Sequence, residues 1–283
     1  MVKLVTIATH DDGYFKWLKL SCERFNTKLY VIGWGEKWQG FKWKLIKIFE
    51  FLKNEDPNEL ICFTDAYDTL LLRPLNEIEE YYNYINKLTK KKIIVSSEDI
   101  KNPLIKVTSK FIFGTCKGIQ LNSGNYIGKA KDLLLIINDI INNYDLRSND
   151  DQVLFTNYCI NNPNIFYIDN EKDIFLTLQT SLDDVLNFNV KVDNDQVFYN
   201  GSKPFIIHAN GNSILDNLIK KLNYNIDTND TKKIHINNYK IIKNKINHFY
   251  NYLNNLYNIE IYLIILFLIV IIFLYKKKHN LFN

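Results

Sequence analysis

The stretch ICFTDAYDTLLL, Ile61–Leu72, places two aspartates, Asp65 and Asp68, between two apolar runs. The run before Asp65 predicts a buried strand that ends at Thr64. In α/β sheets, ligands bind beyond the carboxyl ends of strands, and both aspartates lie there. Two carboxylates three residues apart can converge on a hard cation such as Mg²⁺ or Mn²⁺. An acidic turn is the alternative that this stretch leaves open.

Apolar, β-branched runs alternate with helical periodicity on both sides of this stretch. Such alternation predicts an α/β domain with a mainly parallel sheet. The predicted strands are Lys3–Thr9, Lys28–Ile32, Glu59–Thr64, Lys92–Ser96, Asn125–Ile127, Ile165–Ile168 and Pro204–His208. The predicted helices are Tyr14–Arg24, Lys42–Lys53, Ala130–Asn142 and Asp150–Ile160. In the second helix, Leu45, Ile48 and Leu52 belong to the apolar stripe, and Lys44 is expected outside it.

The charge of the chain is concentrated near its C-terminus. The net charge of +4 comes from 35 basic and 31 acidic residues among 283. Residues 226–283 hold eight lysines and three acidic residues, which leaves the remainder near neutral. A near-neutral domain argues against nucleic-acid binding, which requires a basic face. The four cysteines, Cys22, Cys62, Cys116 and Cys159, form no CxxC pair and are expected to be buried free thiols.

The C-terminal part predicts a membrane anchor. Residues 226–258 are polar and predict a linker, 259–275 contain the apolar run IYLIILFLIVIIFLY, and 276–283 form a basic tail. Such a run next to lysines predicts a single-pass transmembrane helix, with a buried core helix as the alternative. The N-terminus starts as a strand and not as a signal peptide, so the catalytic domain is expected in the cytosol. The lysines after the span favour the opposite orientation.

Other polar residues follow predicted strands or open a predicted helix. His208 ends an apolar strand and is a candidate third metal ligand, and Asn210-Gly211 after it offers a turn to phosphate. The alternative is a histidine at a plain turn. Asp150 and Asp151 open a helix and could meet a sugar hydroxyl, although Ser148 as an N-cap with acids in the first turn explains them equally well. Further candidates are Asn122 and Ser123 in a predicted turn, and Lys42, which could neutralise a phosphate.

The order of these motifs resembles the glycosyltransferase domain of the multifunctional procollagen lysyl hydroxylases. The resemblance covers roughly Val2–Asn225. Its matching segments are LVTIATHDDGYFKWL, Gly33–Trp38, Lys42, FTDAYD, Ser96–Glu98, Leu121–Gly124, Asp150–Gln152, Ile174–Val185 and His208–Gly211. One departure is Asn102-Pro103, which stands where the family has a Trp-Pro pair.

The resemblance implies a GT-A-type, Rossmann-like nucleotide-sugar-binding domain over 1–225. It implies that Asp65, Asp68 and His208 hold Mn²⁺, which binds the diphosphate of UDP. It further implies that Asp150 and Asp151 act in the sugar-donor pocket, that Thr9 and Tyr67 contact the uridine, and that Lys42 lies on the phosphate side.

The expected function is a Mn²⁺-dependent transfer of glucose or galactose from a UDP-sugar to an acceptor hydroxyl. By resemblance, the acceptor is hydroxylysine or galactosyl-hydroxylysine of a collagen-like protein. Two alternatives stay open: a membrane-tethered UDP-sugar-binding module without catalysis, and a transferase that acts on a different glycan. A nucleotide-sugar hydrolase or nucleotidyltransferase on a similar sheet is a further one.

Overall fold

The computed structural model describes residues 2–144, 150–180, 183–211 and 213–227, with single positions at 234, 240 and 243. The chain divides into two compact units, Met1–Ile234 and His235–Asn283. The first unit contains all the strands and helices discussed below. The predicted linker, apolar helix and basic tail lie almost entirely outside the described residues.

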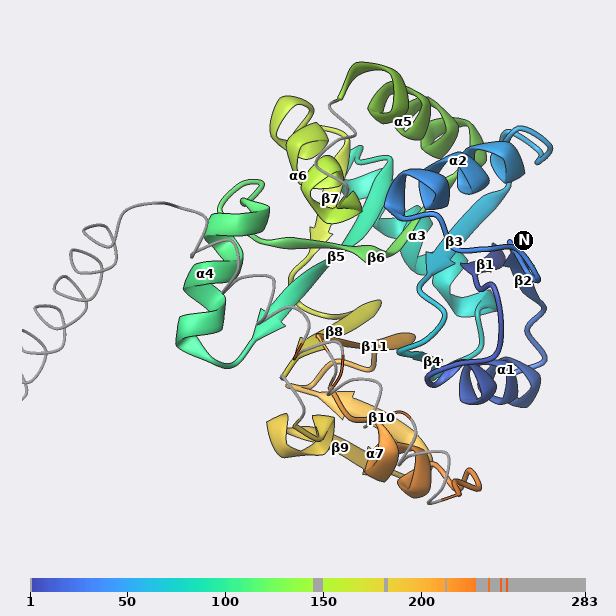
Figure 1. The fold of residues 1–283 in the computed structure, drawn as a ribbon, viewed down its shortest axis with the longest axis vertical. Coiled ribbons are helices and arrows are strands. Elements are labelled where there is room, and N and C mark those ends of the chain that lie inside the picture. Colours follow the sequence, from blue (N-terminus) through green and yellow to red (C-terminus); the bar gives the residue numbers. More distant parts are fainter. Residues whose placement is uncertain are drawn as a thin grey trace, which may run out of the picture. The chain divides into compact units, whose positions relative to one another are not determined.

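A nine-stranded sheet forms the centre of the first unit (Figure 1). Its strand order is β2-β1-β3-β6-β5-β8-β11-β4, and β7 also pairs with β5. The strands are β1 Val2–Ile7, β2 Leu29–Ile32, β3 Leu60–Thr64, β4 Thr69–Leu71, β5 Ile93–Ile100, β6 Leu121–Lys129, β7 Phe166–Asp169, β8 Phe175–Gln179 and β11 Ile206–Asn210. The hairpin of β9 Val190–Asp193 and β10 Gln196–Tyr199 forms a separate sheet.

Helices cover both faces of the large sheet. α2 Phe41–Leu52, α5 Ala130–Asn143 and α6 Asp151–Asn161 pack together on one face (Figure 1). Residues of α1 Phe15–Arg24 and α3 Asn76–Thr89 contribute to a second apolar cluster. The remaining helices are α4 Pro103–Phe113, the 3-10 turn η2 Val185–Phe188 and α7 Asp216–Lys221. The predicted α/β class is therefore confirmed.

The sheet is mixed where the site lies. β6 runs antiparallel to both of its neighbours, β3 and β5, and β4 runs antiparallel to β11. β5 pairs with β6 and β7 through its first half and with β8 through Glu98–Ile100. A register shift between Val95 and Ser96 accompanies this change of partner. Residues 121–125, predicted as a turn into a strand, are instead the buried first half of β6.

Two of the four cysteine predictions are wrong. Cys22 and Cys62 are buried free thiols as expected, but Cys116 and Cys159 form a disulfide. This bond joins the turn before β6 to α6, across 43 positions of sequence. Their spacing carries no pattern, because the fold alone brings the two thiols together.

The predicted membrane location is not supported by the described residues. Within them, no helix is long and apolar enough to cross a bilayer. This finding overturns the prediction of a single-pass membrane protein with a cytosolic catalytic domain. The predicted helix at 259–275 itself lies outside the described residues.

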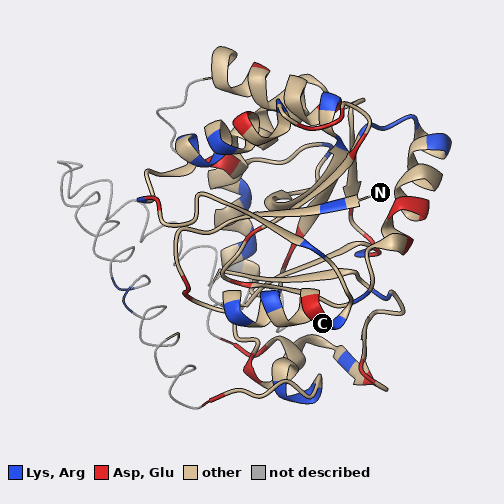
Figure 2. Cartoon of the chain, turned by 90° about the vertical axis from the view of Figure 1, so that its right-hand side faces the viewer, with Lys and Arg blue, Asp and Glu red and all other residues tan. Residues whose placement is uncertain are grey.

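Charged side chains of both signs are spread over the first unit. Figure 2 shows Lys and Arg interspersed with Asp and Glu over its helices and loops. This distribution agrees with the near-neutral charge of the chain before residue 226.

Candidate functional site

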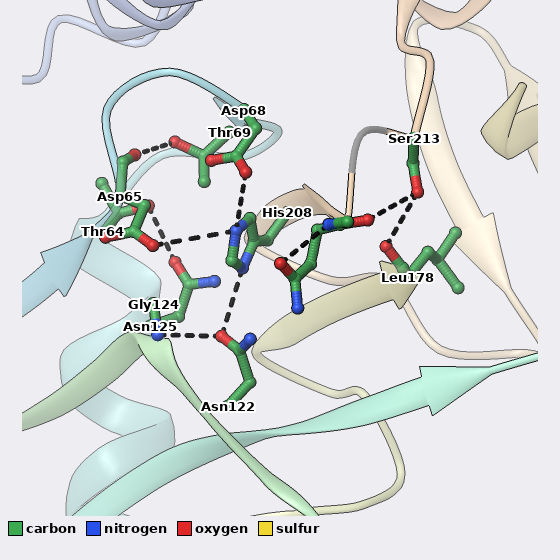
Figure 3. Close-up of polar contacts among 12 residues, drawn as sticks. Thr64, Asp65, Asp68, Thr69, Asn122, Gly124, Asn125, Leu178, His208 and Ser213 are labelled. Atoms are coloured by element: carbon green, nitrogen blue, oxygen red, sulfur yellow. Dashed lines mark hydrogen bonds and ion pairs between the residues drawn. The ribbon is translucent and has the colours of Figure 1, made fainter. Parts of the chain in front are cut away.

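Two carboxylates and one imidazole meet at the edge of β3, β4 and β11. Asp65 and Asp68 lie in the short turn between β3 and β4, and β11 places His208 opposite Thr69 of β4. His208 Nε2 lies 3.2 Å from Asp68 Oδ2 and 3.9 Å from Asp65 Oδ2 (Figure 3). One ligand atom from each residue lies within 4.8 Å of the others. The structure thus brings together the three residues predicted to bind metal.

Backbone hydrogen bonds fix the aspartate turn on both sides. The N–H of Asp65 donates to the carbonyl of Gly124 at 2.8 Å, and the N–H of Ala209 donates to the carbonyl of Asp68 at 2.8 Å. The Thr69 hydroxyl donates to the Asp65 carbonyl. Because β6 and β11 both hold the turn, the two carboxylates are positioned by the sheet.

Gly124 keeps space open beside these three side chains. A Cβ at this position would lie 2.5 Å from His208 Cε1, 2.7 Å from Asp65 Oδ2 and 2.9 Å from Asn122 Oδ1. His208 Nε2 is buried and has no hydrogen-bond partner among the described residues. Two carboxylates and an imidazole suit a divalent transition metal. The residues present therefore fit a metal ion.

Asn122 determines which ring nitrogen of His208 faces the carboxylates. Its Oδ1 accepts from the Gly124 N–H at 2.8 Å and lies 3.2 Å from His208 Nδ1. Because this oxygen is an acceptor, Nδ1 must donate to it, and Nε2 of the neutral ring is left as the ligand. Burial lowers the pKa of His208, but the charges of Asp68 and Asp65 outweigh it and raise the pKa to about 9.

Lys44 of α2 links the three candidate metal ligands Asp65, Asp68 and His208, here called the metal group, to α6. Its Nζ lies 2.7 Å from Asp65 Oδ1 and 2.7 Å from Asp151 Oδ2. The Lys44 and Asp151 side chains are only 5% and 7% exposed. Burial lowers the pKa of Lys44, and the Asp151 and Asp65 carboxylates raise it well above its usual value. The lysine is therefore a fixed cation between two acidic residues of the site.

Lys44 was missed, and the predicted Lys42 is exposed at the start of α2. The amphipathic pattern assigned Lys44 to the solvent side. However, Lys44, Ile48 and Leu52 are spaced by four and are all buried on one face of the helix. This spacing was the available signal.

Asp150 and Asp151 have different partners at the start of α6. Asp150 is the N-cap, and its carboxylate accepts from the Gln152 N–H at 2.9 Å and the Val153 N–H at 3.2 Å. Burial raises the pKa of Asp150, and the neighbouring Asp151 charge adds to the rise. Ser148, the expected cap, lies outside the described residues. The structure therefore gives Asp150 a capping role and directs Asp151 to Lys44.

Glu98 of β5 is a further residue of the site. It belongs to the matching segment Ser96–Glu98, but no role was predicted for it. Its Oε1 accepts from Asn122 Nδ2 at 2.8 Å and from Asn210 Nδ2 at 2.6 Å. Gln152 Oε1 lies 3.4 Å from the same Asn122 nitrogen. Burial raises the pKa of Glu98, while the hydrogen bond from Asn122 opposes the rise. The carboxylate thus connects β5, β6 and β11 beneath the metal group.

Of the predicted nucleotide-side residues, Thr9 contacts Tyr67, and those at 122–123 and 210–211 lie in or after β6 and β11. The Thr9 N–H donates to Tyr67 Oη at 2.9 Å, which holds the end of β1 against the aspartate turn. Ser123 is buried in β6. The Gly211 N–H donates to Asn210 Oδ1 at 2.8 Å and so already has a partner. The predicted contact of this N–H with phosphate would therefore require the hydrogen bond to Asn210 to break.

This fold and site define a class, the glycosyltransferase domains, and residues 1–234 match the family model described as PLOD GT domain. The chain belongs to this family, which confirms the resemblance found in its motifs. It is 28% identical over 236 residues to the procollagen-lysine,2-oxoglutarate 5-dioxygenase of Drosophila melanogaster, covering 76% of this chain and 31% of the relative. It is 25% identical over 230 residues to the multifunctional procollagen lysine hydroxylase and glycosyltransferase LH3 of Rattus norvegicus, covering 74% and 29%.

The chain thus spans about a third of the length of the curated relatives it matches. Among solved structures, the galactosyltransferase LgtC in complex with donor and acceptor sugar analogs is 13% identical with a TM-score of 0.46, covering 82% of this chain and all of that one. A glycosyltransferase involved in the glycosylation of the major capsid of PBCV-1 is 10% identical with a TM-score of 0.46, covering 78% of this chain and 98% of that chain. At these scores the likeness carries no functional argument.

Proposed function

We propose that the chain is a Mn²⁺-dependent GT-A glycosyltransferase that moves glucose or galactose from a UDP-sugar to an acceptor hydroxyl. The observation that carries the proposal is the convergence of Asp65, Asp68 and His208 within 4.8 Å, in a chain of the PLOD GT domain family. An acidic turn with no role would not need Gly124 to keep space beside it, since a Cβ would lie 2.5 Å from His208.

Asp65, Asp68 and His208 would hold the metal. A bound divalent cation neutralises charge on a diphosphate as it leaves. Asn122 contributes by fixing the His208 ring so that Nε2 faces the carboxylates. The pKa of His208, raised to about 9 by Asp68 and Asp65 against burial, means that metal binding near neutral pH releases a proton from the ring.

The two aspartates of α6 would serve the sugar end of the donor. Lys44 holds Asp151 in place, and the cap bonds of Asp150 fix its orientation. A carboxylate held in one orientation can accept a hydrogen bond from a sugar hydroxyl without further loss of side-chain entropy. Thr9 and Tyr67, joined by one hydrogen bond, would border the uracil, and Ser123 and Asn210 would lie near the donor.

The acceptor is proposed from the relatives. Their names refer to procollagen lysine, and LH3 is also named a glycosyltransferase. Hydroxylysine or galactosyl-hydroxylysine in a collagen-like chain is therefore the first acceptor to examine. A hydroxyl of another glycan is the second.

A UDP-release assay on the full chain tests the proposed function. UDP-glucose and UDP-galactose are supplied with Mn²⁺, with and without a hydroxylysine-containing peptide or a simple glycan. We expect Mn²⁺-dependent UDP release that EDTA abolishes and that Asp68→Ala reduces to background. UDP binding without turnover on any acceptor would indicate a binding module, and an Asp68→Ala protein with full activity would contradict the metal assignment.

A further inference from the structure

A row of polar residues crosses the sheet at the carboxyl ends of β5, β8 and β11. In register, Glu98 of β5 lies opposite Thr177 of β8, and Thr177 lies opposite His208 of β11. Two residues further along, Gln179 of β8 lies opposite Asn210. Registered residues on neighbouring strands point to the same face of a sheet. Thr177 and Gln179 therefore share a face with His208, Asn210 and Glu98.

The alternation along β8 shows that this face differs from the apolar one. Leu176 and Leu178 are fully buried in an apolar cluster together with Ile207 and Ala209 of β11. The residues between and after them, Thr177 and Gln179, are polar. Since side chains alternate between faces along a strand, the two polar residues point away from that cluster.

Three oxygen atoms of this row have no hydrogen-bond partner among the described residues. They are Thr177 Oγ1, Gln179 Oε1 and Glu98 Oε2, and each is buried. Thr177 is 0% exposed, whereas Glu98 and Gln179 are only partly buried. Native proteins pair nearly all buried polar atoms, with protein groups, water or ligand. Three such atoms on the same face of β5 and β8 are candidates for pairing with a ligand.

The chemistry of these atoms selects a ligand with O–H groups. A carboxylate oxygen and an amide oxygen are acceptors, and a threonine hydroxyl can both accept and donate. A phosphate offers acceptors at neutral pH and would be repelled by Glu98. A sugar ring offers several hydroxyl donors. Because neighbouring strands lie about 4.8 Å apart, the row extends roughly 10 Å from the strand of His208 to that of Glu98.

Gly211 allows Gln179 to take its place in the row. Gly211 has φ of +67°, and a Cβ there would lie 2.6 Å from Gln179 Cγ and 3.0 Å from Gln179 Nε2. A side chain at 211 would therefore push Gln179 out of position. This gives the conformational freedom of Gly211 a purpose besides the turn itself.

We propose that Thr177 and Gln179 of β8 form a hydroxyl-binding subsite for the hexose of the nucleotide-sugar donor. The inference rests on the proposed function, because the hexose is brought there by the diphosphate at the Asp65, Asp68 and His208 group. Hydroxyls of the hexose would pair with the unpartnered oxygens. The subsite recognises the sugar and contributes nothing to binding of the UDP part.

Titration calorimetry on the full chain in Mn²⁺ tests this subsite with UDP, UDP-glucose and UDP-galactose. Thr177→Val removes the hydroxyl and keeps the shape, and Gln179→Met removes the amide. We expect each variant to bind UDP within about twofold of the wild type and at least one UDP-hexose about tenfold more weakly, which equals about 1.4 kcal/mol. Thr177→Ser should restore the affinity.

Thr156→Val is the matched control, because Thr156 of α6 is also fully buried and its hydroxyl also lacks a partner. It should leave UDP and UDP-hexose affinities unchanged. Equal losses for UDP and UDP-hexose, or no loss, would overturn the subsite, since bonds to water alone give no difference between the two ligands. If Thr177→Val does not fold, Gln179→Met carries the test. A wild-type chain that fails to bind UDP with Mn²⁺ overturns the proposed function and the subsite with it.

Discussion

The two sides of the candidate site differ in how far their polar groups are satisfied. On the α6 side, Asp150 accepts two backbone N–H groups, Asp151 is paired with buried Lys44, and a disulfide ties Cys159 to Cys116. On the metal side, Asp65 and Asp68 are about a third exposed, at 33% and 34%, and His208 Nε2 has no hydrogen-bond partner among the described residues. The groups of the first side are paired within the protein, whereas those of the second are left available to a ligand.

This difference predicts which side of the site contributes most to stability. Groups that pair with each other stabilise the fold, and their fixed orientation also suits them to accept a hydrogen bond from a ligand. Groups that repel each other cost stability and offer binding energy to whatever neutralises them. Asp65 belongs to both sides, because its Oδ1 meets Lys44 while its Oδ2 faces His208. Substitutions on the α6 side should therefore lower stability as well as donor binding, whereas those on the metal side should act mainly on ligand binding.

The largest expected effect comes from Lys44→Met. It leaves the Asp151 carboxylate, 7% exposed, without its cation, and removal of one partner from a buried pair costs about 3–5 kcal/mol of unfolding free energy. Urea unfolding of the metal-free protein measures the loss. Asp151→Asn added to Lys44→Met should recover part of it.

Lys47→Met is the control on the same helix. Lys47 pairs with Glu36, but its side chain lies at the surface, so its removal should change unfolding little. If both lysine variants unfold at the same urea concentration, the α6 side is not held by Lys44.

The Cys116–Cys159 bond should give the next largest effect. It closes a loop of 43 residues next to α6 and β6, and loss of such a crosslink costs about 2–4 kcal/mol. We expect the double variant Cys116→Ala with Cys159→Ala to lower the unfolding free energy by that amount. Any effect that reductant has on the unfolding of the wild type should be absent in this variant. Cys22→Ala with Cys62→Ala should keep the reductant sensitivity, because those thiols are free. A reductant effect that survives in the first double variant would exclude this bond as its source.

On the metal side, Asp68→Asn should affect catalysis more than folding. Loss of residues that only support a metal ligand costs 10–100-fold, so loss of a ligand should lower kcat/KM with Mn²⁺ by about 100-fold or more. Its unfolding curve should stay far closer to wild type than that of Lys44→Met. Asp193→Asn, at an exposed position of β9, is the control and should leave turnover unchanged. Unimpaired turnover in Asp68→Asn would remove the basis for calling this side the metal side.

The smallest effect is a pH dependence of metal-free stability. The pKa of His208 is raised from 6.5 to about 9, because the charges of Asp68 and Asp65 exceed the opposing effect of burial. A raised pKa gives stability that is complete below pH 6.5 and is lost as the pH rises through about 9. Since both carboxylates are partly exposed and screened, we expect a loss of about 1–2 kcal/mol across this window. The loss should be smaller in Asp68→Asn, and equal slopes would contradict the assigned cause.

The strands nearest the site were predictable because their sequences are locally apolar. The predicted strand Glu59–Thr64 corresponds to β3, Leu60–Thr64, and Pro204–His208 overlaps β11, Ile206–Asn210. β8 was not predicted, because the polar Thr177 and Gln179 interrupt its apolar pattern. They are polar because of the face they share with His208, which only the pairing of strands reveals.

The site was predictable where its residues carry a motif and not where they depend on partners far along the chain. Asp65 and Asp68 follow β3 and His208 lies within β11, and their chemistry shows in the sequence. Lys44 meets Asp65 and Asp151, which lie 21 and 107 positions away, and Glu98 meets Asn210, which lies 112 positions away. A buried lysine cannot be told from a surface lysine until those partners are known.

Asn122 limits how this site can change in evolution. Its amide oxygen serves His208 and Gly124, and its amide nitrogen serves Glu98. An aspartate would lose the donor and place a second negative charge against Glu98. An apolar residue of the same shape would leave His208 Nδ1 and the Gly124 N–H without this acceptor and would remove one of the two amide donors to Glu98. Only asparagine among the short side chains has an acceptor and a donor in this arrangement. A relative that lacks Asn122 would therefore need other groups to pair with both the His208 ring and the Glu98 carboxylate.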